Sequence, residues 1–311
     1  MRRRRSKPGQ DSCGSTSHHH VVTDATFFLQ DDPLDRARRH VDAHLFEPLT
    51  LGLLAQAARL SAYHFSRTFT ARFGMSPMAY VRARRLVEAA SRLAADDAPP
   101  LIDLAFDCGF DSQEGFTRAF KRAFGVPPGR YRRGEARNPL EVMTLNETTQ
   151  TRISITQSSA PVRKPGLRIA GFGDLFTEQN KASIPQLWER LVPRLPLAGQ
   201  VGYDTYGVCC AAPEPGSMRY IAGAPIAADA PIPDGLEAIE LAPQAYMIFR
   251  QVMDGGPVHP QMTAAAREIW GERVPRSGRK LAPVPDLEFY PGDSTPDQPG
   301  AWIEWWVPVA G

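Results

Sequence analysis

The sequence is poor in the residues that form disulfides and zinc sites. Its 311 residues include only four cysteines, Cys13, Cys108, Cys209 and Cys210. No two of them have the spacing of zinc ligands, and the adjacent Cys209 and Cys210 cannot readily bridge each other. We therefore expect no metal site and no cofactor. A reducing, cytoplasmic compartment is the simplest interpretation.

Long apolar runs and catalytic signatures are missing as well. The longest apolar stretches fall far short of the roughly 20 residues that cross a bilayer, so we expect no membrane partner. The sequence contains no G-x-S-x-G, no G-x-x-x-x-G-K-[ST] and no H-E-x-x-H pattern. We therefore expect no catalytic residue and no enzyme activity.

The charge is divided unevenly along the chain. Residues 1–134 contain 21 Lys and Arg against 14 Asp and Glu, a net charge of +7, and the remaining residues contain 15 against 20, a net charge of −5. A basic half followed by an acidic half predicts a multidomain protein whose domains have different partners. The basic half could face phosphate.

Two segments lack the pattern of a folded domain. Residues 1–30 begin with a basic run, Arg2 to Arg5, and continue with Ser, Gly and His. No apolar segment follows the arginines, so this is not a secretory signal, and we expect a disordered basic arm. Residues 134–151 turn polar and lose periodicity, which indicates a linker.

Residues 31–133 contain one helical pattern twice. Seven residues of the first copy recur 51 positions later: Phe65, Arg67, Phe69, Phe73, Gly74, Pro77 and Tyr80 are matched by Phe116, Arg118, Phe120, Phe124, Gly125, Pro128 and Tyr131. Upstream, Leu54 matches Leu104 at a spacing of 50, so the second copy has one extra residue in its turn. A long helix from about 77 to 95 joins the copies. The repeat predicts an all-α domain built from one subdomain used twice.

Each copy reads as a short helix, a tight turn and a second helix. Gly109 allows the abrupt helix end in the second copy. Ser61 can cap the second helix of the first copy, and Asp111 or Ser112 can do so in the other. This is a helix-turn-helix pattern, whose second helix can enter the DNA major groove. Its exposed positions are polar and can hold bases or phosphate: Tyr63, His64, Ser66, Arg67, Gln113, Glu114, Thr117, Arg118 and Lys121.

The two stretches "LSAYHFSRTFTARFGMSPMAYVRARRL" and "LAFDCGFDSQEGFTRAFKRAFGVPPGRYRR" resemble the AraC/XylS-family DNA-binding domain, with the MarA, SoxS and Rob subgroup nearest. The resemblance implies that the two recognition helices enter successive major-groove segments of one asymmetric promoter site on double-stranded DNA. It implies that RNA polymerase is a partner and that the protein is nucleoid-associated. The implied contacts are Tyr63, Ser66 and Arg67 in the first helix, and Gln113, Glu114, Thr117 and Arg118 in the second. Lys121 fits a phosphate, and His64 lies beside an apolar stripe that can equally bury it.

Residues 152–311 have a different sequence pattern from the helical region before them. Short strand-like runs alternate with two helices, about 184–192 and 261–270, in the order strand, strand, helix, strand, strand, repeated twice. This predicts an α+β domain of two similar halves, with helices on an antiparallel sheet. All five tryptophans lie in it, and acidic residues stand among the aromatics. The period of two groups Glu288 with Tyr290, and Trp302 with Glu304 and Trp306.

The segments "IPQLWERL", "RYIAGAPI", "PDLEFY" and "WVPV" resemble the GyrI-like, SHS2-type effector-binding domain. Such domains bind small, often aromatic or cationic molecules between their two halves. The resemblance implies that Glu288 is the charged anchor of the site, and the aromatic companions that we expect are Trp188, Tyr220, Tyr290 and Trp302. A cation gains from both aromatic faces and a carboxylate.

Together these patterns predict a sequence-specific DNA-binding transcriptional regulator whose C-terminal domain senses a small aromatic or cationic molecule. The alternative is a DNA-tethered small-molecule hydrolase or drug-sequestering protein that uses the same site, with Glu288 as its working carboxylate.

Overall fold

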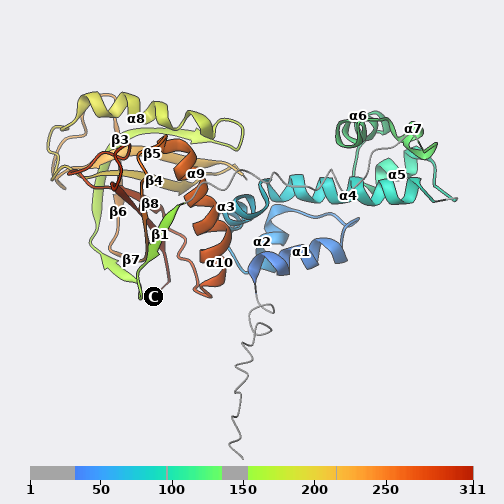
Figure 1. Ribbon diagram of the computed structural model, residues 1–311, viewed down its shortest axis with the longest axis horizontal. Coiled ribbons are helices and arrows are strands. Elements are labelled where there is room, and N and C mark those ends of the chain that lie inside the picture. Colours follow the sequence, from blue (N-terminus) through green and yellow to red (C-terminus); the bar gives the residue numbers. More distant parts are fainter. Residues whose placement is uncertain (1–31, 96, 135–152, 215, 311) are drawn as a thin grey trace, which may run out of the picture. The chain divides into compact units, whose positions relative to one another are not determined.

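The computed structural model describes residues 32–95, 97–134, 153–214 and 216–310 (Figure 1). The expected basic arm at residues 1–30 lies outside the described residues, as does nearly all of the expected linker at 134–151. The described helical part begins with a Pro at the first helical position of α1, where proline's missing N–H costs nothing. Its helices are α1 (Pro33–Ala43), α2 (Leu51–Ala58), α3 (Ala62–Phe73), α4 (Pro77–Leu93), α5 (Leu101–Asp107), α6 (Gln113–Phe124) and α7 (Pro128–Arg132).

The ends of α3 and α6 follow from their capping residues. The Ser61 side chain accepts a hydrogen bond from the His64 backbone N–H at 3.2 Å, and Ser112 accepts one from Gly115 at 3.1 Å. Of the two candidates for the second cap, the structure therefore uses Ser112. Both helices end at a left-handed glycine, Gly74 and Gly125.

Two separate hydrophobic cores confirm that the helical subdomain is used twice. Phe65 and Phe69 of α3 lie in the first core, and Phe116 and Phe120 of α6 lie in the second. The helix α4 contributes to both cores, because Tyr80 and Val81 pack in one while Leu86, Ala90 and Leu93 pack in the other. It is therefore the connecting helix that the repeat predicts.

The described residues of the C-terminal part form an antiparallel sheet of nine strands. Its order is β1-β7-β9-β8-β4-β5-β3-β6, with β2 also paired to β7. The strands are β1 (Ser154–Gln157), β2 (Val162–Lys164), β3 (Leu167–Phe176), β4 (Thr205–Ala211), β5 (Met218–Pro225), β6 (Glu237–Leu241), β7 (Gln244–Val252), β8 (Asp286–Tyr290) and β9 (Trp302–Pro308). The two halves meet where β4 pairs with β8.

One helix from each half covers the same face of the sheet. The helix α8 (Pro185–Leu191) packs on Tyr220 and Cys209, and α9 (Val258–Glu268) packs on Phe249 and Trp305. Register places Cys209 opposite Tyr220 and Asp286, and Trp305 opposite Glu288 and Phe249, so these residues share that face. The duplicated α+β architecture is confirmed. The remaining short helices are η2 (Lys181–Ser183), η3 (Val192–Arg194), the π-helical turn η4 (Ile269–Arg273) and α10 (Val274–Arg276).

Two details of the sheet differ from the sequence pattern. The strand-like segment 201–208 becomes strand only from Thr205, because Gly202 adopts a left-handed conformation with φ of +73°. The strand β6 is hard to recognise in the sequence, because it is an edge strand whose two glutamates hide its periodicity. No helix of the described segments is both long and apolar enough to cross a lipid bilayer.

Candidate functional site

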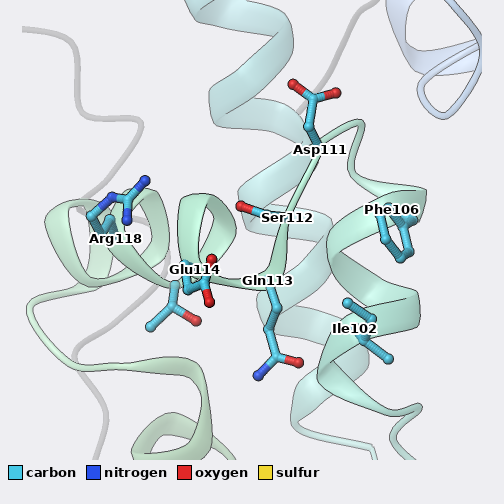
Figure 2. Close-up of a pocket in the computed structure, with 8 residues that line it drawn as sticks. Ile102, Phe106, Asp111, Ser112, Gln113, Glu114 and Arg118 are labelled. Carbon is cyan, nitrogen blue, oxygen red and sulfur yellow. The ribbon is translucent and has the colours of Figure 1, made fainter.

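The helix α6 presents an exposed polar face. Gln113, Glu114, Arg118 and Lys121 are exposed, and Thr117 is half-buried. Figure 2 shows Gln113 between Ile102 of α5 and Glu114, with Arg118 further from α5. Gln113, Glu114 and Arg118 line an open pocket of about 660 Å³. Its apolar wall is formed by Ile102 and Phe106, whose side chains are 39% and 56% exposed. This face is available to a large polar partner.

The equivalent face of α3 is covered by the C-terminal domain. The Tyr63 hydroxyl donates to Asp286 Oδ1 at 3.0 Å, and Arg67 Nη2 lies 3.0 Å from Asp286 Oδ2. Arg67 Nη1 also donates to the Tyr63 hydroxyl oxygen at 3.1 Å. Only 16% of the Arg67 side chain and 3% of the Asp286 side chain remain exposed. The three residues therefore form one desolvated, hydrogen-bonded group.

Burial dominates the electrostatics of this group. Burial raises the pKa of Asp286, and the Arg67 charge and the Tyr63 hydrogen bond oppose that rise. The same burial raises the pKa of the Tyr63 phenol well above its ordinary value. Arg67 also lies 4.4 Å from the centroid of the Trp270 ring, over its face. A guanidinium in contact with both a carboxylate and an indole face has the environment of a bound cation.

His64 is part of the same contact. It is 2% exposed, and its ring stacks on Trp270 with centroids 6.0 Å apart. Its Nδ1 lies 3.0 Å from Ser61 Oγ, whereas its buried Nε2 has no hydrogen-bond partner among the described residues. Burial, aided by the Arg67 charge, lowers the pKa of His64 to about 4. Of its two sequence interpretations, the structure shows the buried one.

The backbones of α3 and η4 approach each other closely. A Cβ added to Gly271 would lie 3.0 Å from the Arg72 backbone N and 3.1 Å from its Cα. Arg72 Nε donates to the Gly271 carbonyl at 2.5 Å and lies 3.5 Å from Glu272 Oε1. The absence of a side chain at Gly271 therefore permits this packing.

Four of the five predicted ligand residues gather around one carboxylate. Glu288 Oε2 accepts hydrogen bonds from the Tyr220 hydroxyl at 2.7 Å and the Tyr290 hydroxyl at 3.0 Å. Trp188 Nε1 donates to the Tyr220 oxygen at 3.1 Å, and its ring meets Tyr290 edge to face at 4.8 Å. We call Trp188, Tyr220, Glu288 and Tyr290 the Glu288 cluster. It joins one negative group to three aromatic rings.

The Glu288 carboxylate is desolvated. The residue is 9% exposed, and burial raises the pKa of its carboxyl, while the two phenol hydrogen bonds and the Arg67 charge lower it. Gly207 on β4 makes room for the cluster, since a Cβ there would stand 2.1 Å from the Tyr220 hydroxyl and 2.7 Å from Glu288 Oε2.

The fifth predicted ligand residue, Trp302, is not brought to the cluster. Strand register places Glu288 opposite Trp305, whereas Trp302 shares its face of β9 with Glu304 and Trp306. Trp302 packs on Phe289 and lies under the Arg250 guanidinium, 4.0 Å from ring centroid to Cζ. It therefore belongs to the opposite face of the sheet.

Sequence reasoning missed Asp286, Gly207 and Gly271 as site residues. Asp286 had a signal, because it stands two positions before Glu288 on the same strand face. The two glycines had none, because their importance arises from neighbours far away in the chain. Within the described segments, no group of three or more His, Cys, Asp or Glu is placed to hold a metal ion.

Comparison with known proteins finds matches to two separate parts of the chain. A family model for a helix-turn-helix domain matches residues 54–134, and one for the GyrI-like small molecule binding domain matches residues 162–310. The chain is 43% identical over 93 residues to the right origin-binding protein of Escherichia coli K12, covering 30% of this chain and 32% of that protein. It is 36% identical over 101 residues to the multiple antibiotic resistance protein MarA of Escherichia coli K12, covering 31% of this chain and 79% of MarA. The chain belongs to the AraC-type helix-turn-helix family.

The AraC-type match is confined to the N-terminal part. The chain spans about a third of the length of the first curated relatives that it matches. Among solved structures, that of SAV2435 bound to tetraphenylphosphonium covers 52% of this chain and 95% of its own, with 20% identity and a TM-score of 0.40. In this AraC-type chain the helix-turn-helix region is thus joined to a GyrI-like domain.

Proposed function

We propose that this protein is a DNA-binding transcriptional regulator whose GyrI-like domain binds a small aromatic cation. The DNA-binding part of this proposal rests on the exposed face of α6. Gln113, Glu114 and Arg118 are exposed side by side on the second helix of a helix-turn-helix unit, which is the helix that reads bases in such motifs. Its partners are double-stranded DNA and RNA polymerase, and its place is the nucleoid in the cytoplasm.

The side chains on α6 suit distinct tasks. A guanidinium such as that of Arg118 can bind guanine through two hydrogen bonds, and Gln113 can bind adenine. Lys121 is exposed one turn further along the helix, where it fits a phosphate. Base contacts specify a sequence and phosphate contacts hold the register, so the two classes should respond differently to mutation.

The test is a binding assay on a duplex enriched from a random-sequence library by the full-length protein. We expect Arg118→Ala to weaken binding by about 1–3 kcal/mol and to relax specificity at one base pair. Lys121→Ala should weaken binding uniformly and reduce the slope of log affinity against log salt by about one. Glu240→Gln on the edge strand β6 is the control. If Arg118→Ala and Lys121→Ala both bind like this control, α6 is not the DNA-reading helix.

The ligand-binding part of this proposal rests on the Glu288 cluster. A buried carboxylate with three aromatic rings around it combines the two features that attract an organic cation, ring faces and a negative charge. The pairing stabilises the complex only if the cation offsets the cost of desolvating the carboxylate, and Glu288 is already desolvated in the free protein. A bulky aromatic monocation such as tetraphenylphosphonium is the probe of choice.

The hydrolase alternative has one supporting feature. A buried carboxyl with a raised pKa, as at Glu288, is the kind of group that serves as a general base. Incubation of the protein with an aromatic cationic ester, followed by chromatography, tests this reading. Turnover that Glu288→Gln abolishes would favour the hydrolase over the sensor.

A further inference from the structure

The face of α3 that corresponds to the exposed face of α6 is held by the GyrI-like domain. Arg67 and Arg118 are equivalent positions of the repeat, yet Arg118 is exposed while Arg67 is paired with Asp286. Thr70 is only 9% exposed, whereas its counterpart Lys121 is exposed. The difference arises from what packs on α3, because the two helices carry the same apolar stripe toward their own cores.

The contact runs along much of α3. Tyr63 and Arg67 meet Asp286, Ala71 packs against the core under α9, and Arg72 meets Gly271. Between these contacts, Tyr63, Ser66 and Arg67 line a cavity of about 170 Å³ whose other wall comes from the C-terminal domain, including Phe176, Lys181 and Met218. A helix held in this way cannot at the same time lie in a major groove, because the same side chains would have to face both.

The surface that receives Arg67 has the chemistry of a cation site. Asp286 supplies the carboxylate and Trp270 supplies the ring face. Asp286 also stands two residues from Glu288 on the same face of β8, and the Arg67 charge acts on both carboxyls. Arg67 and an organic cation at the Glu288 cluster are therefore two positive charges drawn to one acidic strand.

We propose that Arg67 acts as an internal ligand of the GyrI-like domain, which holds the first recognition helix away from DNA until an aromatic cation bound at the Glu288 cluster displaces it. This inference rests on the proposed function and names its regulation. In the docked form only α6 is presented to DNA, and in the released form α3 and α6 both are. By linkage, a cation that favours the released form strengthens DNA binding, and DNA strengthens binding of the cation by the same factor.

Two variants of the full-length chain should separate α3 from the GyrI-like domain by different means. Asp286→Asn removes the charge that holds Arg67 and keeps the shape of the side chain. Gly271→Val adds a side chain where even a Cβ would stand 3.0 Å from the α3 backbone. The matched control is Glu304→Gln, which breaks the Arg250–Glu304 pair on the opposite face of the sheet.

The first readout is affinity for duplexes enriched in parallel by the wild type and by Gly271→Val. We expect both opening variants to bind DNA between about 5- and 150-fold more tightly than the wild type, the range usual for coupled sites. Tetraphenylphosphonium should raise the affinity of the wild type and of Glu304→Gln, and should leave both opening variants nearly unchanged. Opening variants that bind like the wild type would overturn the inference while leaving the DNA-binding proposal standing.

The second readout needs no DNA. Ser66→Cys places a thiol in the interface cavity, and its rate of labelling by a maleimide, located by mass spectrometry, reports release of α3. We expect labelling to be accelerated by tetraphenylphosphonium and by Gly271→Val, but not by Glu304→Gln. Equal rates throughout would overturn the inference even if Arg118→Ala had already disproved DNA binding by α6.

Discussion

Arg67 and Arg118 stand 51 residues apart at the same position of two copies of one motif, and the protein uses them in opposite ways. Arg118 is exposed on α6, whereas Arg67 is buried between Asp286 and the Trp270 ring. Local sequence cannot produce this difference, because the flanking Phe residues and caps of the two helices are alike. The GyrI-like domain produces it by supplying a carboxylate and an indole to one copy only.

Truncation of the two arginines should therefore have unequal effects on stability. Arg67→Met leaves the Asp286 carboxylate buried without its cation, and we expect a loss of about 1–3 kcal/mol in the free energy of unfolding. Arg118→Met removes an exposed side chain and should change it by less than about 0.5 kcal/mol. Urea denaturation of both variants checks this. Equal losses would mean that the Arg67–Asp286 pair contributes nothing net.

Stability should fall on mild acidification because of His64. Its pKa is about 4 in the folded protein, because burial penalises the charged form, whereas an exposed histidine titrates near 6.5. The stabilisation that arises because the folded protein keeps this ring neutral is complete above pH 6.5. It is lost as the pH falls toward 4. Between pH 7.5 and 5 we expect a loss of about 2 kcal/mol.

The control for the acid effect is His64→Gln, which cannot titrate. The charged or titratable groups beside His64 are Tyr63, whose ring centroid lies 5.2 Å from that of His64, and Arg67, whose charge helps to lower its pKa. The raised pKa of Asp286 acts in the opposite direction, because burial disfavours its ionised form and acid relieves that penalty. The difference between wild type and His64→Gln in thermal denaturation across this range isolates the histidine. If the difference in melting temperature between wild type and His64→Gln did not change with pH, His64 would not be a buried neutral ring.

Glu288→Gln should separate charged from neutral ligands. The substitution keeps size and hydrogen bonding but removes the charge, so we expect tetraphenylphosphonium to bind about tenfold or more weakly, equivalent to about 1.4 kcal/mol. Triphenylphosphine oxide, which is neutral, should bind unchanged. Trp188→Ala should weaken both, because a cluster ring is lost, and Trp302→Ala should weaken neither. Calorimetric titration decides, and equal loss of both ligands on Glu288→Gln would show a purely structural carboxylate.

Gly207→Ala should disturb the Glu288 cluster from the strand beneath it. The new Cβ would overlap the Tyr220 hydroxyl and crowd Glu288 Oε2, and overpacking of this kind costs about 1–3 kcal/mol. Gly129→Ala in α7 is the control; a Cβ there meets no atom of the described residues within 4 Å, so the change should be neutral or slightly stabilising. Thermal denaturation of the pair provides the measurement. If Gly207→Ala and Gly129→Ala had equal melting temperatures, the Tyr220–Glu288 contact would be loosely packed.

The helical half could be predicted from the sequence almost completely. Its signals are local: the repeat of Phe65, Phe69 and Phe73 at four-residue intervals, the caps at Ser61 and Ser112, and the glycine stops. The duplicated sheet and the gathering of Trp188, Tyr220 and Tyr290 around Glu288 were also within reach, because strand periodicity and family resemblance both pointed there.

The docking of α3 on the other domain was out of reach. Tyr63 and Asp286 are separated by 223 positions, and nothing near either residue shows that they meet. Trp302 shows the complementary error: its aromatic character suggested a ligand contact, but the pairing of β8 with β9 sets Glu288 opposite Trp305, and Trp302 lies on the other face of β9. A period of two assigns residues to faces of one strand, but only the pairing of β8 with β9 says which faces coincide.

Hydroxyl-radical footprinting tests the central claim most directly, since it shows how many recognition helices reach DNA. On one enriched duplex, the wild type without ligand should protect a single groove segment, held by α6. Gly271→Val, or the wild type with tetraphenylphosphonium, should protect a second segment about one helical turn, or roughly 10 base pairs, away. Protection of both segments by the ligand-free wild type, unchanged in Gly271→Val, would contradict the account.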